Sequence, residues 1–208
     1  LTLYHMEISD FQDRSYDGVS YSLQNAGDIR SQGAEFEVSL RPNSDLRLYV
    51  SGAYLDSEFT DYTGASNLPG LPGTVDITGT RPQFATEWTG SVGLEYESEI
   101  EGTDLSFAFR SDLAFSSDSP RGVVNDANPQ VVHEPYELLN ARATLYGPGG
   151  RWSISAFGNN LTQTDYCTSY SYMPFGGLVG GVGGGRSALT CNTVGTPRTL
   201  GIAASFEF

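Results

Sequence analysis

Two cysteines, Cys167 and Cys191, are the residues whose chemistry the sequence indicates most directly. Both lie in one long segment between predicted strands, and an oxidising compartment favours their pairing. Closing a loop of about 24 residues would stabilise the fold by about 3 kcal/mol in the chain-entropy model. Free thiols are the alternative, and zinc is a poor one because His5 and His133 are remote in sequence. We predict a Cys167–Cys191 disulfide, no metal site and no cofactor.

A glycine-rich run over residues 176–186 resembles a phosphate-binding loop only superficially. It lacks the Lys-Ser/Thr pair of a P-loop, and no helical pattern follows it to supply aligned backbone amides. We interpret it as an outer loop, which in a receptor could close over a ligand.

Carboxylates are abundant, and the formal net charge is −14. This charge argues against nucleic acid, whose phosphate backbone needs a basic face. Paired acids could serve glycoside hydrolysis or bind calcium, but no EF-hand spacing is present. Ser, His and Asp also occur, but the Gly-x-Ser-x-Gly motif of a nucleophilic serine is absent. We therefore predict no catalytic residue and interpret the acids as solvated. They gather around two loops: Asp56, Glu58, Asp61 and Asp76, and Asp112, Asp118 and Asp126.

Aromatic residues make up 12% of the chain, and those near strand ends are expected to form interfacial girdles. Rings farther out in loops can instead stack on a sugar or another flat ligand, and Arg or His can meet an anionic ligand. The predicted ligand-contact residues are Tyr62, Arg121, His133, Tyr170, Tyr172, Phe175 and Arg186.

The elements that would position these residues are strands, because polar and apolar residues alternate with period two and helical spacing is absent. Several exceed the ~5–6 residues of a soluble strand and match the ~9–11 tilted residues that cross a bilayer. The second and longest could be broken near residues 25–27. We predict eight strands, at 2–13, 19–41, 45–60, 82–98, 103–117, 135–147, 151–164 and 197–208.

The connections alternate between short and long. Short turns rich in Gly, Pro, Asn and Asp fall at 41–45, 98–102 and 147–150. Long segments fall at 61–81, 118–134 and 165–196, with a shorter one near 13–18. This asymmetry is typical of transmembrane antiparallel β-barrels, with short periplasmic turns and long extracellular loops. An extracellular β-sandwich would give the same polar–apolar alternation and remains the alternative.

Six segments, in order, resemble strands of TonB-dependent outer-membrane receptors. They include a "NAG…GxExE" strand, an "LLNAR" strand, an "NL-x-D-x-x-Y" strand end and a terminal "PRT-x-G…F" strand. Together they extend across nearly the whole chain, at residues 25–37, 46–56, 82–96, 138–142, 152–166 and 197–208.

The resemblance implies that residues 1–208 are the C-terminal portion of a barrel of roughly 22 strands in the bacterial outer membrane. It also implies that further strands, a plug domain and a TonB-contacting segment precede Leu1, which opens inside a strand pattern. The expected function is import of a scarce solute such as a ferric siderophore, cobalamin or oligosaccharide. Expected partners are outer-membrane lipid, the TonB complex and the transported ligand.

The last strand, which ends with Phe206 and Phe208, resembles the signal read by the barrel-assembly machinery. An ordinary final strand is the alternative. Two other classes of protein remain open. Eight strands could close alone into a small barrel with a structural or adhesive role, or this chain could be one subunit of a split receptor.

Overall fold

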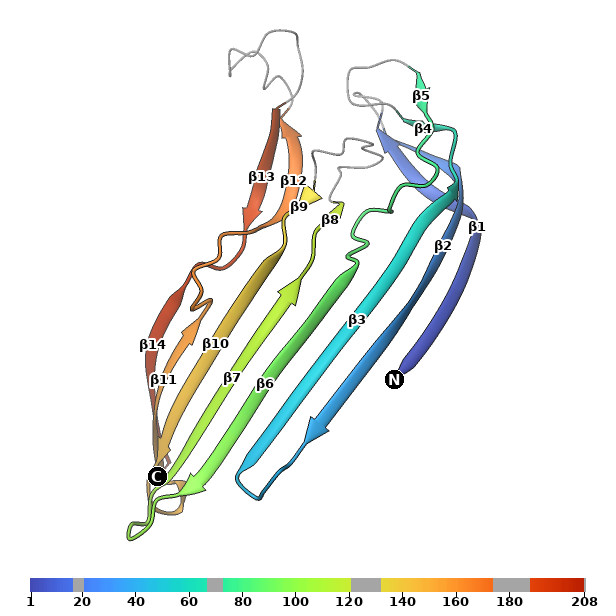
Figure 1. The fold of residues 1–208 in the computed structure, drawn as a ribbon. Helices are drawn as coiled ribbons and strands as arrows, with labels where there is room; N and C mark the ends of the chain where they lie inside the picture. Colours follow the sequence, from blue (N-terminus) through green and yellow to red (C-terminus); the bar gives the residue numbers. More distant parts are fainter. Residues whose placement is uncertain (17–20, 67–72, 121–131, 174–187, 208) are drawn as a thin grey trace.

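One eight-stranded antiparallel sheet dominates the computed structural model, which describes residues 1–16, 21–66, 73–120, 132–173 and 188–207 (Figure 1). Each strand pairs with the next long strand along the chain, so the eight predicted strands are confirmed. In order across the sheet they are β1 (Thr2–Tyr16), β2 (Tyr21–Leu40), β3 (Leu46–Asp61), β6 (Trp88–Glu99), β7 (Ser106–Ser116), β10 (Tyr136–Tyr146), β11 (Trp152–Asn159) and β14 (Thr199–Phe206).

Two predicted strand boundaries are wrong, in both cases because the backbone turns. Residues 82–87 form a turn before β6, in which Phe84 has a φ of 63° and the amide of Ala85 donates to the carbonyl of Pro82. β11 ends at Asn159 rather than 164, because the backbone turns between Asn160 (φ 50°) and Gln163 (φ 56°), where the Gln163 amide donates to the Asn160 carbonyl at 2.9 Å.

The longest strand, β2, runs without the expected break near residues 25–27. Instead, Gly27 adopts a φ of 117°, and the register with β3 shifts between Asp28 and Ile29. Pairing with β1 also shifts on either side of Phe11. Bulges of this kind bend a strand while keeping it in the sheet, and glycine tolerates the required φ.

Short and long connections alternate along the chain, as predicted. Tight turns join β2 to β3, β6 to β7, and β10 to β11 at one end of the sheet, and the C-terminus lies near this short-turn end (Figure 1). In the first, the side chain of Asn43 accepts hydrogen bonds from the amides of Asp45 and Leu46, at 3.0 and 2.8 Å. The third contains a single 3₁₀ turn, η1 (Pro148–Gly150).

The long connections meet at the opposite, long-loop end and contain small hairpins that the sequence pattern did not predict. Four of the added strands have only two residues, which is too short to show a period, whereas β12 and β13 have seven residues each and lie in the segment that was interpreted as one long loop. The added pairs are β4 (Ala65–Ser66) with β5 (Thr74–Val75), β8 (Ser119–Pro120) with β9 (Val132–His133), and β12 (Cys167–Met173) with β13 (Ala188–Val194).

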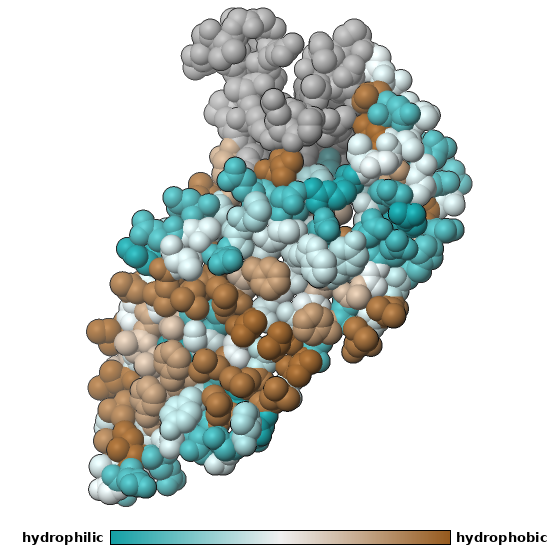
Figure 2. All heavy atoms as spheres, in the orientation of Figure 1, coloured by the Kyte–Doolittle hydropathy of each residue, from teal (hydrophilic) through white to brown (hydrophobic). Residues whose placement is uncertain are grey.

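The strand register separates an apolar face from a polar face. One row of directly paired residues crosses five strands as Val38, Val50, Val92, Leu113 and Leu139. The adjacent row, on the opposite face, is Ser39, Tyr49, Gly93, Asp112 and Asn140. Apolar side chains form a band over the sheet, with hydrophilic residues towards both ends (Figure 2). A sheet with lipid on one side and water on the other has this distribution.

The sheet is open. β1 and β14 lie at its two edges and do not pair with each other. The alternative of a self-closed eight-stranded barrel is therefore wrong for this arrangement of strands. Among the described residues, no helix is long and apolar enough to cross a membrane.

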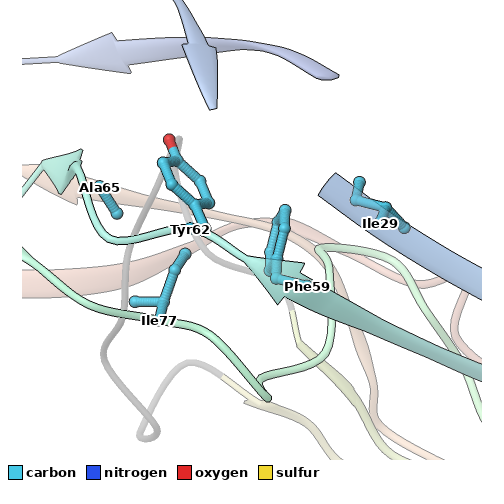
Figure 3. Close-up of a cluster of buried hydrophobic side chains, with 5 residues drawn as sticks. All are labelled: Ile29, Phe59, Tyr62, Ala65 and Ile77. Atoms are coloured by element: carbon cyan, nitrogen blue, oxygen red, sulfur yellow. The ribbon is translucent and has the colours of Figure 1, made fainter. Parts of the chain in front are cut away.

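Buried apolar residues concentrate in one cluster at the long-loop end, on the polar face of the sheet. The Tyr62 cluster consists of Ile29, Phe59, Tyr62, Ala65 and Ile77 (Figure 3). The rings of Phe59 and Tyr62 meet edge to face, with centroids 5.1 Å apart. The amide of Ile77 donates to the carbonyl of Tyr62, and the amide of Gly79 to that of Phe59. The connection after β3 therefore folds back and packs against the sheet.

Candidate ligand site at the long-loop end

A pocket of about 440 Å³ lies where β9 and the β12–β13 hairpin emerge from the main sheet. Acidic, aromatic and apolar groups are all represented in its wall. Its lining residues are Val132, His133, Glu134, Pro135, Asp165, Tyr166, Cys167, Cys191 and Val194. We refer to it as the His133 pocket.

His133 is held deep in the protein, with only 3% of its surface exposed. Its Nδ1 lies 3.1 Å from the carbonyl oxygen of Glu134. A carbonyl can only accept, so this hydrogen bond requires the proton on Nδ1. β9 pairs with β8 through the partners Ser119 and His133, and Ser119 is also buried. The short β8–β9 ladder therefore positions this imidazole.

An aromatic stack supports the pocket from the side of the main sheet. The rings of Tyr136 and Tyr166 are nearly parallel, with centroids 4.8 Å apart and an interplanar angle of 12°. The His133 ring lies 5.3 Å from Tyr136 and 6.5 Å from Tyr166. Gly195 donates its amide to the Tyr166 carbonyl, and a Cβ there would fall 2.1 Å from the Tyr166 ring. Only glycine allows this close approach of the backbone.

The predicted disulfide between Cys167 and Cys191 is present, with Cα atoms 5.9 Å apart. It joins β12 to β13, and both half-cystines line the pocket. A cross-link over this sequence separation contributes about 3 kcal/mol in the chain-entropy model. It holds the base of the hairpin against the pocket.

Asn160 fastens the two chain segments that lead into and out of this hairpin. Its side chain is buried, and its Nδ2 donates to the carbonyls of Thr164 at 2.9 Å and Thr196 at 3.0 Å. Its Oδ1 accepts the Thr164 amide at 2.9 Å. Its own amide donates to the Asn140 side chain, whose Nδ2 donates to Asp112. A buried amide with all these partners holds the hairpin base in one geometry.

The polar face below the pocket carries charged and aromatic side chains. Glu95 lies between Arg47 and Arg110, with N–O distances of 3.5 and 3.3 Å. The Arg142 guanidinium lies 4.9 Å from the centre of the Phe157 ring. These groups are partly exposed, so each pair is worth little on its own. They make the inner surface hydrophilic.

The structure places the predicted ligand-contact residues in different surroundings. His133 lines the pocket, whereas Tyr62 is 1% exposed and packs in its own cluster. Tyr170 and Tyr172 lie on β12, opposite Cys191 and Leu189 in register. Three others, Arg121, Phe175 and Arg186, fall outside the described residues, as does Phe208 of the expected assembly signal. Ligand contact by these residues therefore remains a prediction.

Sequence reasoning missed Tyr136, Tyr166 and Asn160 as parts of the site. Both tyrosines lie near the ends of predicted strands, where aromatic residues were expected only to form interfacial girdles. Asn160 lay within a predicted strand, although an Asn-Asn pair is also a turn signal. Within the described ranges, no group of three or more His, Cys, Asp or Glu residues is arranged to hold a metal ion.

Comparison with known proteins defines the class. Residues 1–161 match the family model described as "TonB dependent receptor-like, beta-barrel". Because the match covers well over half of the chain, this protein belongs to that family, whose members are bacterial outer-membrane proteins. The short turns therefore face the periplasm and the long connections face the exterior.

Three solved structures share the fold. The ferric yersiniabactin uptake receptor FyuA from Yersinia pestis has 19% identity and a TM-score of 0.70, over 99% of this chain and 27% of that one. The siderophore receptor PiuA from Acinetobacter baumannii has 16% identity and a TM-score of 0.66, over 97% and 24%. The ferric-catecholate import receptor Fiu from E. coli K12 has 15% identity and a TM-score of 0.60, over 99% and 24%. The chain thus spans about a quarter of each.

Proposed function

We propose that this chain forms part of a TonB-dependent receptor that imports a ferric siderophore. The observation that carries the proposal is the open sheet itself, apolar on one face and hydrophilic on the other, which matches the family's barrel. The three similar structures are named as receptors for siderophores or ferric complexes. The His133 pocket at the extracellular end supplies a place where such a ligand could first bind.

The two sheet edges require partners, because unpaired backbone groups facing lipid cost several kcal/mol each. In our proposal, β1 and β14 pair with other strands of one longer receptor polypeptide. That polypeptide would also carry the plug domain through which TonB acts. The intact mass of the polypeptide in outer membranes tests this point. A mass several-fold above 22.4 kDa supports it, and a mass near 22.4 kDa supports a split receptor instead.

We also propose that β14 is recognised during insertion by the barrel-assembly machinery. Its apolar face carries Leu200, Ile202 and Phe206, which are 72, 80 and 61% exposed. An alternating apolar edge strand is a template for pairing as the sheet grows. Replacing Phe206 and Phe208 with Ala should lower the amount of folded receptor in the membrane. A normal level would contradict this role.

Uptake of radiolabelled iron tests the transport proposal. A strain lacking the receptor gene is grown under iron limitation and supplied with iron bound to siderophores from its own spent medium. We expect uptake to fall on deletion, to return on complementation, and to fall equally when TonB is removed. Undiminished uptake in the deletion strain, with no other siderophore receptor expressed, would contradict siderophore import.

A further inference from the structure

We propose that the His133 pocket binds an organic cation, specifically an ammonium group carried by the ligand. The inference rests on the proposed function and adds a chemical class to it. An acidic, partly aromatic and partly apolar cavity is suited to a positively charged group and unsuited to an anionic one.

Charge is the first argument. Glu134 and Asp165 both line the pocket and are exposed at its rim. Neither carboxylate forms an ion pair with any residue that the structure describes. No basic side chain other than His133 is among the lining residues, and the chain contains no Lys. Two carboxylates beside one cavity, unpaired within the described part of the chain, attract a cation and repel an anion.

The basic residue of the neighbouring connection is already occupied. Arg81 forms a charge-assisted hydrogen bond with the Asp118 carboxylate, directly before β8, and also donates to the Asp118 carbonyl at 3.4 Å. Among the described residues, Arg81 is therefore engaged with Asp118 and does not pair with Glu134 or Asp165.

The rest of the lining suits an ammonium group with an alkyl stem. Val132, Pro135, Val194 and the disulfide provide an apolar wall against which the alkyl stem can pack. The Tyr166 ring, supported by Tyr136, adds aromatic surface. Aromatic rings combined with carboxylates are a recurrent solution for binding organic ammonium groups.

The cavity is also organised before any ligand arrives. The disulfide joins both strands of the hairpin, and Asn160 hydrogen-bonds the chain on either side of it. A pocket held in this way loses little conformational entropy on binding. The carboxylates therefore stay near the site rather than being brought there by the ligand.

Three derivatives of one chelate test the charge preference. The probes are a linear ferric trihydroxamate with a free terminal amine, its N-acetyl derivative, and its N-succinyl derivative. They share the iron centre and differ in carrying a cationic, neutral or anionic end group. Binding to the intact receptor, purified from outer membranes, is measured by equilibrium dialysis of radiolabelled iron.

We expect the free amine to bind most tightly and the succinyl derivative least, with about a twofold to fivefold step in affinity for each change. In a Glu134→Gln/Asp165→Asn receptor the three affinities should converge, because the charges that distinguish them are gone. Glu137→Gln is the matched control, since this acid lies only a few residues away but on the apolar face of β10, opposite Phe115. The Glu137→Gln receptor should retain the order of the three affinities.

Equal affinities in the unmodified receptor, or tightest binding of the succinyl derivative, would overturn the inference. So would an affinity order that survives the double substitution. Failure of all three probes to bind would also overturn it. The proposed function is judged separately, because iron uptake in the deletion strain does not depend on which chelate the pocket prefers.

Discussion

Two regions at the extracellular end are built in opposite ways. The Tyr62 cluster is filled with apolar side chains, and its connection is fastened to β3 by main-chain hydrogen bonds. The His133 pocket remains hollow and is held around its border by a disulfide and by the buried Asn160 amide. A loop that only needs to be anchored can bury its own residues. A loop that must leave space for a ligand needs cross-links at its base.

The largest expected effect is in the filled region. Phe59→Ala removes a buried ring between Ile29 and Tyr62, and large-to-small core changes of this type cost about 3–5 kcal/mol. Hydrogen exchange in the purified receptor should then speed up at the amides of Ile77 and Gly79. The neighbouring exposed residue gives the control, Thr60→Ala, which should leave both amides protected. Unchanged protection in Phe59→Ala would show that main-chain pairing alone anchors the loop.

The disulfide tests the hollow region. Replacing Cys167 and Cys191 with Ser should destabilise the β12–β13 hairpin by about 3 kcal/mol. Exchange should accelerate over residues 188–194 while Ile77 and Gly79 stay protected, because the Tyr62 cluster does not contact the disulfide. Treating the unmodified receptor with reductant should have the same effect. An equal increase in amide exchange in both regions would mean that the two regions are coupled. It would contradict the view that the disulfide stabilises only the His133 pocket.

Asn160 offers a more selective change in the same region. Asn160→Ala removes the donors to the carbonyls of Thr164 and Thr196, and each of these part-buried hydrogen bonds contributes about 0.5–1.5 kcal/mol. Binding of the preferred chelate should weaken while the disulfide remains intact, as measured by thiol labelling. Asn159→Ala is the matched control because Asn159 is exposed. Unaltered affinity in Asn160→Ala would remove this residue from the set that positions the pocket.

The smallest expected effect concerns Asp76 and acid pH. Its carboxylate accepts a hydrogen bond from the Thr78 amide at 2.9 Å, which lowers the pKa of Asp76 below its ordinary value of 3.8. The stability that this hydrogen bond gives to the folded connection is thus fully present above the ordinary pKa of Asp76. It is lost as the pH falls through the lowered pKa. Asp76→Asn should abolish that loss, measured as Thr78 amide exchange corrected for intrinsic rate. A pH response that persists in the variant would assign it to another group.

Much of the architecture follows from local sequence. Alternation such as Leu200, Ile202 and Phe206 against small or polar neighbours reports the two faces of a strand, because side chains alternate with period two. Turn residues such as Asn43 report where strands reverse, since their side chains satisfy the backbone locally. The disulfide was also predictable, because only two cysteines exist and both lie in one connection.

Tertiary structure decided what the long connections do. Nothing local distinguishes Tyr62, which is buried among Ile29 and Phe59, from a tyrosine that faces a ligand. Tyr166 meets Tyr136 only because the sheet brings the ends of β10 and β11 together. Burial and pocket shape depend on contacts between residues far apart in the chain. Local patterns therefore predict the eight long strands, the tight turns and the strand order, whereas packing between connections selects which side chains form the site.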